Sequence, residues 1–355
     1  MTTTQTSVVH DLGTLAHRLS HPARTPCVCE PPQVLADRPD GTVVRSGAIV
    51  AKAHAADTDR EALAARIALA AAPQLAGILL PPLTATEPAA PTARPVTLWP
   101  LGAPVDPTDP GAAPWAEAAD LLARLHRTEP PFPLPPMRGP AKAARAVARM
   151  RAALRGDAIA LPRDPVVEPG DAITPPRDPA VEPGDATAPP RDPAVLSVLA
   201  GWRSLPAWAR GEAPAPGPRA DALCHGDLHL GQLVRHPAPD GPWLLIDMDD
   251  AGVGDPAWDL GRPAAWYAAG LLAPEDWSTF LDAYRAAGGP AVPADGDPWP
   301  ALDVPARALT VQTAAVALAK CAAEQRDPDD HEQLMIESCA RIATLPPELA
   351  TGPAS

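Results

Sequence analysis

The sequence predicts an α+β fold of two lobes, a small lobe with a mixed β-sheet and a large, mainly helical lobe. The chain has 355 residues, which is long enough for two lobes with hydrophobic cores. Strand-type segments are concentrated in the first hundred residues, whereas helical periodicity dominates the remainder. We therefore expect a small N-terminal lobe at residues 1–100, a large lobe at 101–345 and a disordered tail at 346–355.

The small lobe is expected to begin with an amphipathic helix at residues 8–20, where Leu12, Leu15 and other apolar residues recur at helical spacing. A β-hairpin follows, because Pro39-Asp40-Gly41 is a turn sequence between two apolar runs. The Ala-rich residues 59–72 predict a second helix. The expected strands are residues 33–38, 42–45, 48–54 and 95–101.

The large lobe begins with a predicted helix at residues 115–127, whose apolar residues lie on one face. The 51 prolines predict many rigid connections between the helices. The further expected helices are residues 141–155, 263–272, 274–287, 305–325 and 331–344.

A repeat with a period of fourteen residues interrupts this lobe, and its first unit reads GDAIALPRDPVVEP. Three units cover residues 156–195, and each carries several prolines and no helical or strand periodicity. The repeat therefore predicts an extended, flexible surface insertion. An inert linker is favoured over a substrate lid or a partner-binding arm.

Charge and cysteine content restrict the partners of the chain. With 29 basic and 43 acidic residues the net charge is −14, which excludes a basic nucleic-acid-binding face. The five cysteines form no paired framework, and residues 1–13 lack the features of a secretory signal. Arg66 and Gln74 interrupt the most apolar segment, so no membrane span is expected. These observations predict a cytoplasmic protein whose oligomeric state stays open.

The chemistry is indicated by two acidic segments. Residues 225–232 read HGDLHLGQ, and residues 246–250 read IDMDD after an apolar strand. Phosphoryl transfer requires one carboxylate for the incoming hydroxyl and oxygen ligands for magnesium on the nucleotide phosphates. Asp227, Gln232 and Asp247 have the order and spacing of those groups in a kinase catalytic loop and metal-binding loop.

Together with GVGDPAWDL at residues 252–260, these segments resemble the signature of the aminoglycoside phosphotransferase and choline kinase family, which has a protein-kinase-like fold. The resemblance implies a kinase that transfers the γ-phosphate of ATP or GTP to a hydroxyl of an aminoglycoside, sugar or amino alcohol. It implies that Asp227 is the catalytic base and that Gln232 and Asp247 bind Mg²⁺. His225 and Asp259 would support the catalytic loop.

The resemblance also implies a nucleotide site in the small lobe. Lys52 would bind the phosphates. A lysine at this position is notable because the chain has only three lysines beside 26 arginines. Glu61 could pair with Lys52, or it could complete a capping box that begins at Thr58. The adenine would lie near Trp99 and Leu101 in the connector between the lobes.

Two departures from the family pattern leave alternatives open. Gln232 stands where aminoglycoside kinases have Asn, and the loop also resembles that of bacterial maltokinases. No glycine-rich phosphate loop is present in the sequence, so the alternative function is a nucleotide-binding pseudokinase with a regulatory role. His225 and His229 have the spacing of zinc ligands, but no third ligand accompanies them, and a structural role is expected.

Overall fold

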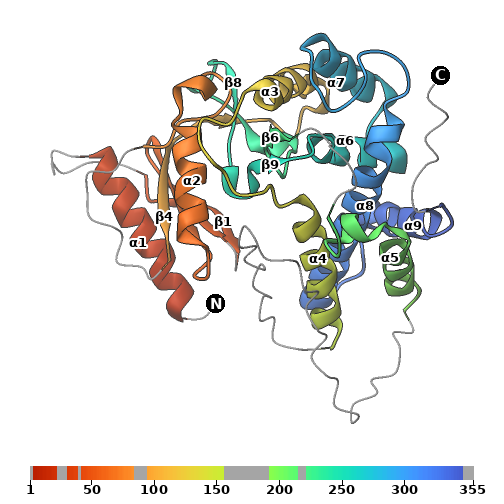
Figure 1. Ribbon diagram of the computed structural model, residues 1–355. Coiled ribbons are helices and arrows are strands. Elements are labelled where there is room, and N and C mark those ends of the chain that lie inside the picture. Colours follow the sequence, from red (N-terminus) through yellow and green to blue (C-terminus); the bar gives the residue numbers. More distant parts are fainter. Residues whose placement is uncertain are drawn as a thin grey trace.

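A computed structural model of the protein describes residues 3–21, 30–38, 41–83, 94–155, 192–214 and 221–346. It confirms the α+β fold with a small sheet-containing lobe and a large helical lobe (Figure 1). The hairpin residues Pro39 and Asp40, the repeat at 156–191 and the tail from residue 347 lie outside the described residues.

The small lobe is built on a four-stranded sheet with the order β1-β2-β3-β4. All of its pairings are antiparallel, so the expected mixed sheet is corrected. Short connections between β1, β2 and β3 impose this arrangement, since parallel neighbours need long crossovers. Leu12 and Ala16 of α1 pack on Val44 and Ala51 of the sheet. The elements are α1 (Thr3–Ser20), β1 (Gln33–Arg38), β2 (Gly41–Ser46), β3 (Ile49–His54), α2 (Arg60–Ala70) and β4 (Val96–Pro100).

The start of α2 differs from the capping box that Thr58 and Glu61 could have formed. Asp59 is the N-cap residue, and its carboxylate accepts hydrogen bonds from the backbone N–H groups of Glu61 and Ala62. Asp is as good an N-cap as Thr, and here the helix begins one residue later than the capping-box reading requires.

The main core of the large lobe is formed by its helices around α8. Two of these helices begin about six residues before the predicted positions, because Pro263 and Pro305 lie inside them rather than at their starts. Both prolines are buried, and Gly261 allows α6 to approach Pro305 of α8 closely. Packing between the helices thus outweighs the backbone hydrogen bonds that proline removes. The helices are α3 (Trp115–Arg127), α4 (Gly139–Arg155), α5 (Pro193–Ser204), α6 (Ala257–Ala269), α7 (Pro274–Ala286), α8 (Trp299–Glu324) and α9 (Asp330–Ile342).

The end of the repeat is helical, which corrects the expectation that the insertion extends to residue 195. Asp192 caps α5 by accepting from the N–H of Ala194, and Pro193 occupies the first helical position. Proline is favoured there because that position needs no N–H donor. Val195 is buried in the core, so the third repeat unit contributes to the fold.

Short strands at the junction of the lobes carry the acidic segments (Figure 1). β6 pairs with β9, and β7 pairs with both β5 and β8. These strands are β5 (Ala103–Pro104), β6 (Ala222–Cys224), β7 (Leu233–Arg235), β8 (Trp243–Leu245) and β9 (Gly252–Gly254).

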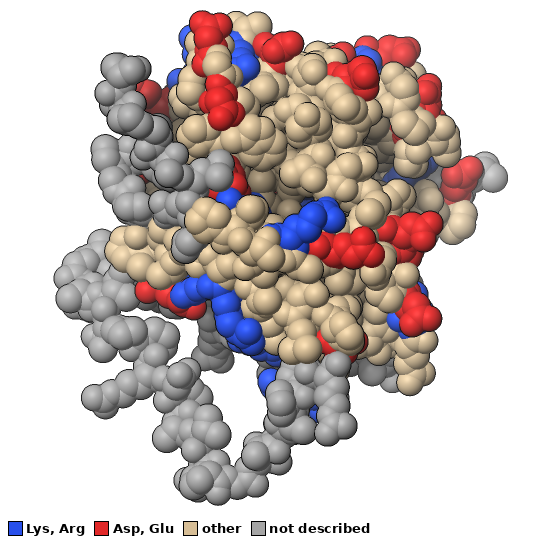
Figure 2. Space-filling model, turned by 90° about the vertical axis from the view of Figure 1, so that its right-hand side faces the viewer, with Lys and Arg blue, Asp and Glu red and all other residues tan. Residues whose placement is uncertain are grey.

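Figure 2 shows the face that lies to the right in Figure 1, and most of that face carries neither acidic nor basic side chains. No extended basic surface for nucleic acid is visible there. Within the described part of the chain, no helix is both long and apolar enough to cross a membrane.

Candidate active site

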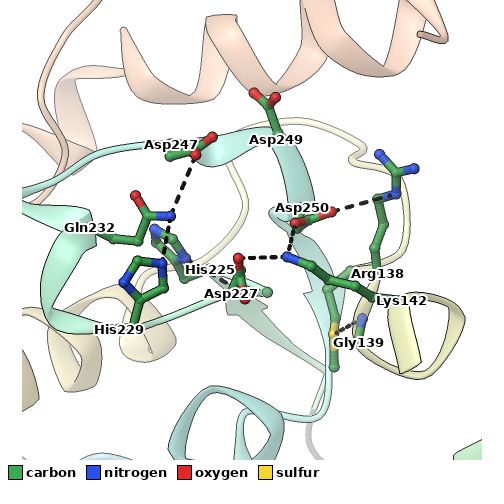
Figure 3. Close-up of polar contacts among 12 residues, drawn as sticks. Arg138, Gly139, Lys142, His225, Asp227, His229, Gln232, Asp247, Asp249 and Asp250 are labelled. Atoms are coloured by element: carbon green, nitrogen blue, oxygen red, sulfur yellow. Dashed lines mark hydrogen bonds and ion pairs between the residues drawn. The ribbon is translucent and has the colours of Figure 1, made fainter. Parts of the chain in front are cut away.

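The two acidic segments meet because their flanking strands pair. Asp227 lies in the loop between β6 and β7, and Asp247 lies two residues after the end of β8. Since β6 pairs with β9 and β7 pairs with β8, both loops lie at the same end of these short strands (Figure 3). Side chains of both acidic segments therefore form one cluster.

The backbone of the catalytic loop is held by hydrogen bonds to Asp259, a buried residue of α6. Its carboxylate accepts hydrogen bonds from the backbone N–H of His225 at 2.6 Å and of Gly226 at 2.7 Å. It also lies 3.0 Å from Nε2 of His126 on α3, whose Nδ1 lies 2.7 Å from the hydroxyl of Tyr284. Burial opposes the charge of Asp259, but these donors lower the pKa of its carboxyl.

Gly226 is required by the close contact between the two loops. Its φ of +84° is in the left-handed region, and a Cβ atom there would lie 2.2 Å from the carbonyl oxygen of Asp250. The backbone of the catalytic loop, residues 225–232, can therefore lie directly against residues 246–251, which we call the metal-side loop.

Asp227 faces two cations from separate helices. Its Oδ2 atom lies 2.6 Å from Nζ of Lys142 on α4, and its Oδ1 atom accepts a hydrogen bond from Arg262 on α6. Burial would raise the pKa of Asp227, but Lys142 and Arg262 lower it to about 2. Asp227 is therefore ionised throughout the neutral range.

Asp247 and Gln232 lie together, as their spacing predicts. Nε2 of the Gln232 amide lies 3.4 Å from Oδ2 of Asp247, and the Gln232 side chain is largely buried (Figure 3). Asp247 has a φ of +62°, a strained conformation that is unusual for a residue other than glycine. One carboxylate and one amide held side by side at the end of a strand fit the oxygen ligands that Mg²⁺ prefers.

Lys52 reaches the same loop from β3. Its Nζ atom lies 2.6 Å from Oδ1 of Asp247 and 2.9 Å from Oδ2 of Asp249. Burial opposes the charge of Lys52, but these aspartates raise its pKa, so the side chain stays an ammonium. Glu61 is exposed in the first turn of α2, and the ion pairs described for Lys52 are made with aspartates instead.

The resemblance implies that Lys52 binds the nucleotide phosphates. On that basis, replacing Lys52 with Met is expected to raise the KM for nucleotide roughly 10- to 100-fold, which corresponds to the loss of one charge-assisted hydrogen bond. Steady-state kinetics with varied nucleotide would measure it. The matched control is Lys320→Met, because Lys320 is exposed on α8. Equal KM values for the two variants would contradict the phosphate-binding role of Lys52.

The resemblance implies that adenine lies near the connector between the lobes, where several polar groups already form hydrogen bonds. The backbone N–H of Leu101 donates to the carbonyl of Ala48, and the Leu101 carbonyl lies 3.2 Å from Nδ1 of His236. The indole N–H of Trp99 donates to Thr97. The N–H of Leu101 is therefore already engaged, whereas its carbonyl oxygen has a second lone pair that can accept another hydrogen bond.

The two histidines of the catalytic loop lie in structural positions. His225 is fully buried, and its Nε2 atom lies 2.8 Å from the carbonyl oxygen of Ile246. Burial and the Arg262 charge lower the pKa of His229 to about 4, and its Nδ1 atom accepts from the N–H of Gly231. Both rings are thus engaged in holding the turn.

Several site residues were not identified from the sequence. Lys142 and Arg262 contact Asp227, and Arg66 of α2 donates to the carbonyl of Ala251 at 2.8 Å. His126 lies beneath Asp259. The rarity of lysine singles out Lys142 as much as Lys52, whereas nothing in the sequence distinguishes these arginines from the others.

A narrow pocket opens beside Asp227 on the side of the large lobe. It is lined by apolar and polar side chains of α6 and α8 and by the start of α4. Its lining includes Gly139, Asp227, Trp258, Arg262, Leu309 and Gln312. The carboxylate of Asp227 forms part of the wall of this pocket.

The fold is that of a kinase-like phosphotransferase. A family model described as the phosphotransferase enzyme family, APH, matches residues 92–303, and the chain belongs to this family. The protein is therefore a phosphotransferase that acts on an alcohol group of a small molecule. No curated protein matches the chain.

Solved structures show the same fold at low sequence identity. A choline kinase from Cryptosporidium parvum Iowa II has a TM-score of 0.53 and 10% identity, with 90% of each chain covered. A thermostable mutant of aminoglycoside phosphotransferase APH(4)-Ia, in complex with AMP-PNP and hygromycin B, has a TM-score of 0.51 and 12% identity, covering 92% of this chain and 97% of that one. The choline kinase LicA from Streptococcus pneumoniae has a TM-score of 0.50 and 12% identity, covering 95% of this chain and 98% of that one.

Proposed function

We propose that the protein transfers the γ-phosphate of ATP or GTP to a hydroxyl of an aminoglycoside, a sugar or an amino alcohol. The observation that carries this proposal is the cluster formed by Asp227, Asp247 and Lys52. It combines an ionised carboxylate at a pocket with a second carboxylate of the kind that binds metal ions and a half-buried ammonium.

In the proposed reaction the acceptor oxygen bonds to the γ-phosphorus, and the bond from that phosphorus to the β–γ bridging oxygen breaks. Asp227 orients the acceptor hydroxyl and receives its proton, while the nucleoside diphosphate leaves. Lys52 neutralises phosphate oxygens on the nucleotide side. When bound, Mg²⁺ supplies further neutralisation of the phosphates, and Asp247 and Gln232 are the residues that would hold it.

The test is transfer of γ-labelled phosphate from ATP and from GTP to a panel of aminoglycosides, sugars and amino alcohols. We expect label in one acceptor class with one preferred nucleotide. Nucleotide binding without transfer to any acceptor or to water would favour the pseudokinase alternative. A chain that binds neither nucleotide would contradict the proposal as a whole.

Asp247→Asn is expected to raise the Mg²⁺ concentration for half-maximal activity by roughly 100-fold or more, because it replaces the ionised metal ligand. Binding of Mn²⁺, followed by electron paramagnetic resonance, would measure the same loss without turnover. Asp282→Asn is the matched control, since Asp282 is exposed on α7. Unchanged Mn²⁺ affinity in Asp247→Asn would place the metal site elsewhere.

A further inference from the structure

Lysine is used sparingly in this chain, and its placement is informative. Only three lysines occur beside 26 arginines, and two of them, Lys52 and Lys142, lie in the active site. Each bridges two aspartates. Lys52 does so on the nucleotide side, and Lys142 does so on the acceptor side, where the proposed function assigns no role to a cation.

The geometry at Lys142 is unusually close for two separate loops. Its Nζ atom lies 2.6 Å from Oδ2 of Asp227 and 2.6 Å from Oδ2 of Asp250, so one ammonium joins the catalytic loop to the metal-side loop (Figure 3). Arg138, one turn earlier in the chain, approaches Asp250 at 3.6 Å, and its backbone N–H donates to the Asp250 carbonyl. The start of α4 is therefore fixed to the metal-side loop at three points.

The positive charges of Lys142 and Arg262 lie next to the negative charge of Asp227. Burial opposes the charge of Lys142, but Asp250 and Asp227 raise its pKa, so both members of the pair are charged at neutral pH. Arg262 occupies the other oxygen of Asp227. An ammonium has three N–H donors, and the two described contacts leave one for an oxygen of the acceptor or of the phosphoryl group. The compact ammonium suits this bridge better than the planar fork of arginine.

We propose that Lys142 is a positioning residue of the active site, which holds the Asp227 carboxylate toward the acceptor pocket and ties it to the metal-side loop through Asp250. The inference rests on the proposed function, because it takes Asp227 as the group that meets the acceptor. A purely structural salt bridge would affect stability, whereas a positioning residue must affect the chemical step.

The kinetic test compares Lys142→Met and Lys142→Arg with Lys320→Met, using the acceptor found in the transfer assay. Lys142→Met is expected to lower kcat about 100-fold, with the KM for nucleotide within about twofold of wild type. Lys142→Arg should recover part of the loss, and Lys320→Met should match wild type. A Lys142→Met variant with kcat within threefold of wild type and only a lowered Tm would overturn the positioning role.

The pH profile gives a second signature of the same variant. Lys142 helps to lower the pKa of Asp227, so its removal should move the acid limb of kcat to higher pH, since Asp227 must be ionised to act. An acid limb that stays in place would contradict the coupling between these residues.

A third measurement does not depend on turnover. Protein carrying ¹³Cε-labelled lysine has one signal for each of its three lysines, and Lys142→Met identifies the Lys142 signal. Asp227→Asn and Asp250→Asn are each expected to shift that signal and to lower its titration midpoint, while leaving the Lys320 signal unchanged. If Asp227→Asn changed neither the chemical shift nor the titration midpoint of the Lys142 signal, the inference would be overturned. A wild-type protein that transfers no phosphate would instead refute the proposed function, whatever this spectrum shows.

Discussion

Replacing Asp227 with Asn is expected to lower kcat for phosphoryl transfer by about 1,000-fold or more. The amide cannot receive the acceptor proton, and it no longer balances the two cations, Lys142 and Arg262, that contact the carboxylate. Nucleotide affinity should stay near the wild-type value, because Lys52 and Asp247 bind on the other side of the cluster. Single-turnover transfer of γ-labelled phosphate, with nucleotide binding measured separately, would test both statements.

The control for this variant is its stability, because the substitution leaves two half-buried cations, Lys142 and Arg262, without the carboxylate that they share. A thermal unfolding curve should show that the Asp227→Asn protein is folded at the assay temperature. If the folded variant kept more than a tenth of the wild-type kcat, Asp227 would not be the catalytic base. Another carboxylate, such as Asp250, would then have to take that role.

The local signals of the sequence predict much of this fold. The strands at residues 33–54, the connector strand and the helix at 115–127 are confirmed within one or two residues. The predicted starts of α6 and α8 were wrong. The effect of proline on a helix was judged from local sequence, whereas the burial of Pro263 and Pro305 depends on packing between helices. Local propensity cannot report that packing.

The site shows the same division. The spacing of Asp227, Gln232 and Asp247 predicts one cluster, because all three lie on adjacent short strands and their loops. The partners from distant segments were not predicted. Lys142 comes from a helix far upstream, and its contact with Asp227 depends on how α4 packs against α8. A motif specifies the residues within it, and tertiary packing selects the charges around them.

Asp259→Asn is expected to reduce the free energy of unfolding by about 3–5 kcal/mol, the range for breaking a buried charged network on one side. Asp259 is fully buried, and its carboxylate accepts from the N–H groups of His225 and Gly226 and lies against His126. Asn has an NH₂ group in place of one carboxylate oxygen. This group would face at least one of these N–H groups, so a buried N–H would lose its acceptor. Urea unfolding at neutral pH would measure the loss, and Asp282→Asn should change it by less than about 0.5 kcal/mol.

The dependence of stability on pH follows from the same carboxylate. The folded-state pKa of Asp259 is lower than its unfolded value, so its contribution is fully present above the unfolded pKa and is lost as pH falls through the folded pKa. The difference in unfolding free energy between wild type and Asp259→Asn should therefore be largest at neutral pH and should shrink in acid. Because Asp259 holds the backbone of the catalytic loop, kcat of the variant should fall even where the protein is folded. A variant that lost stability but kept wild-type kcat would show that Asp259 supports the core of the large lobe rather than the position of Asp227.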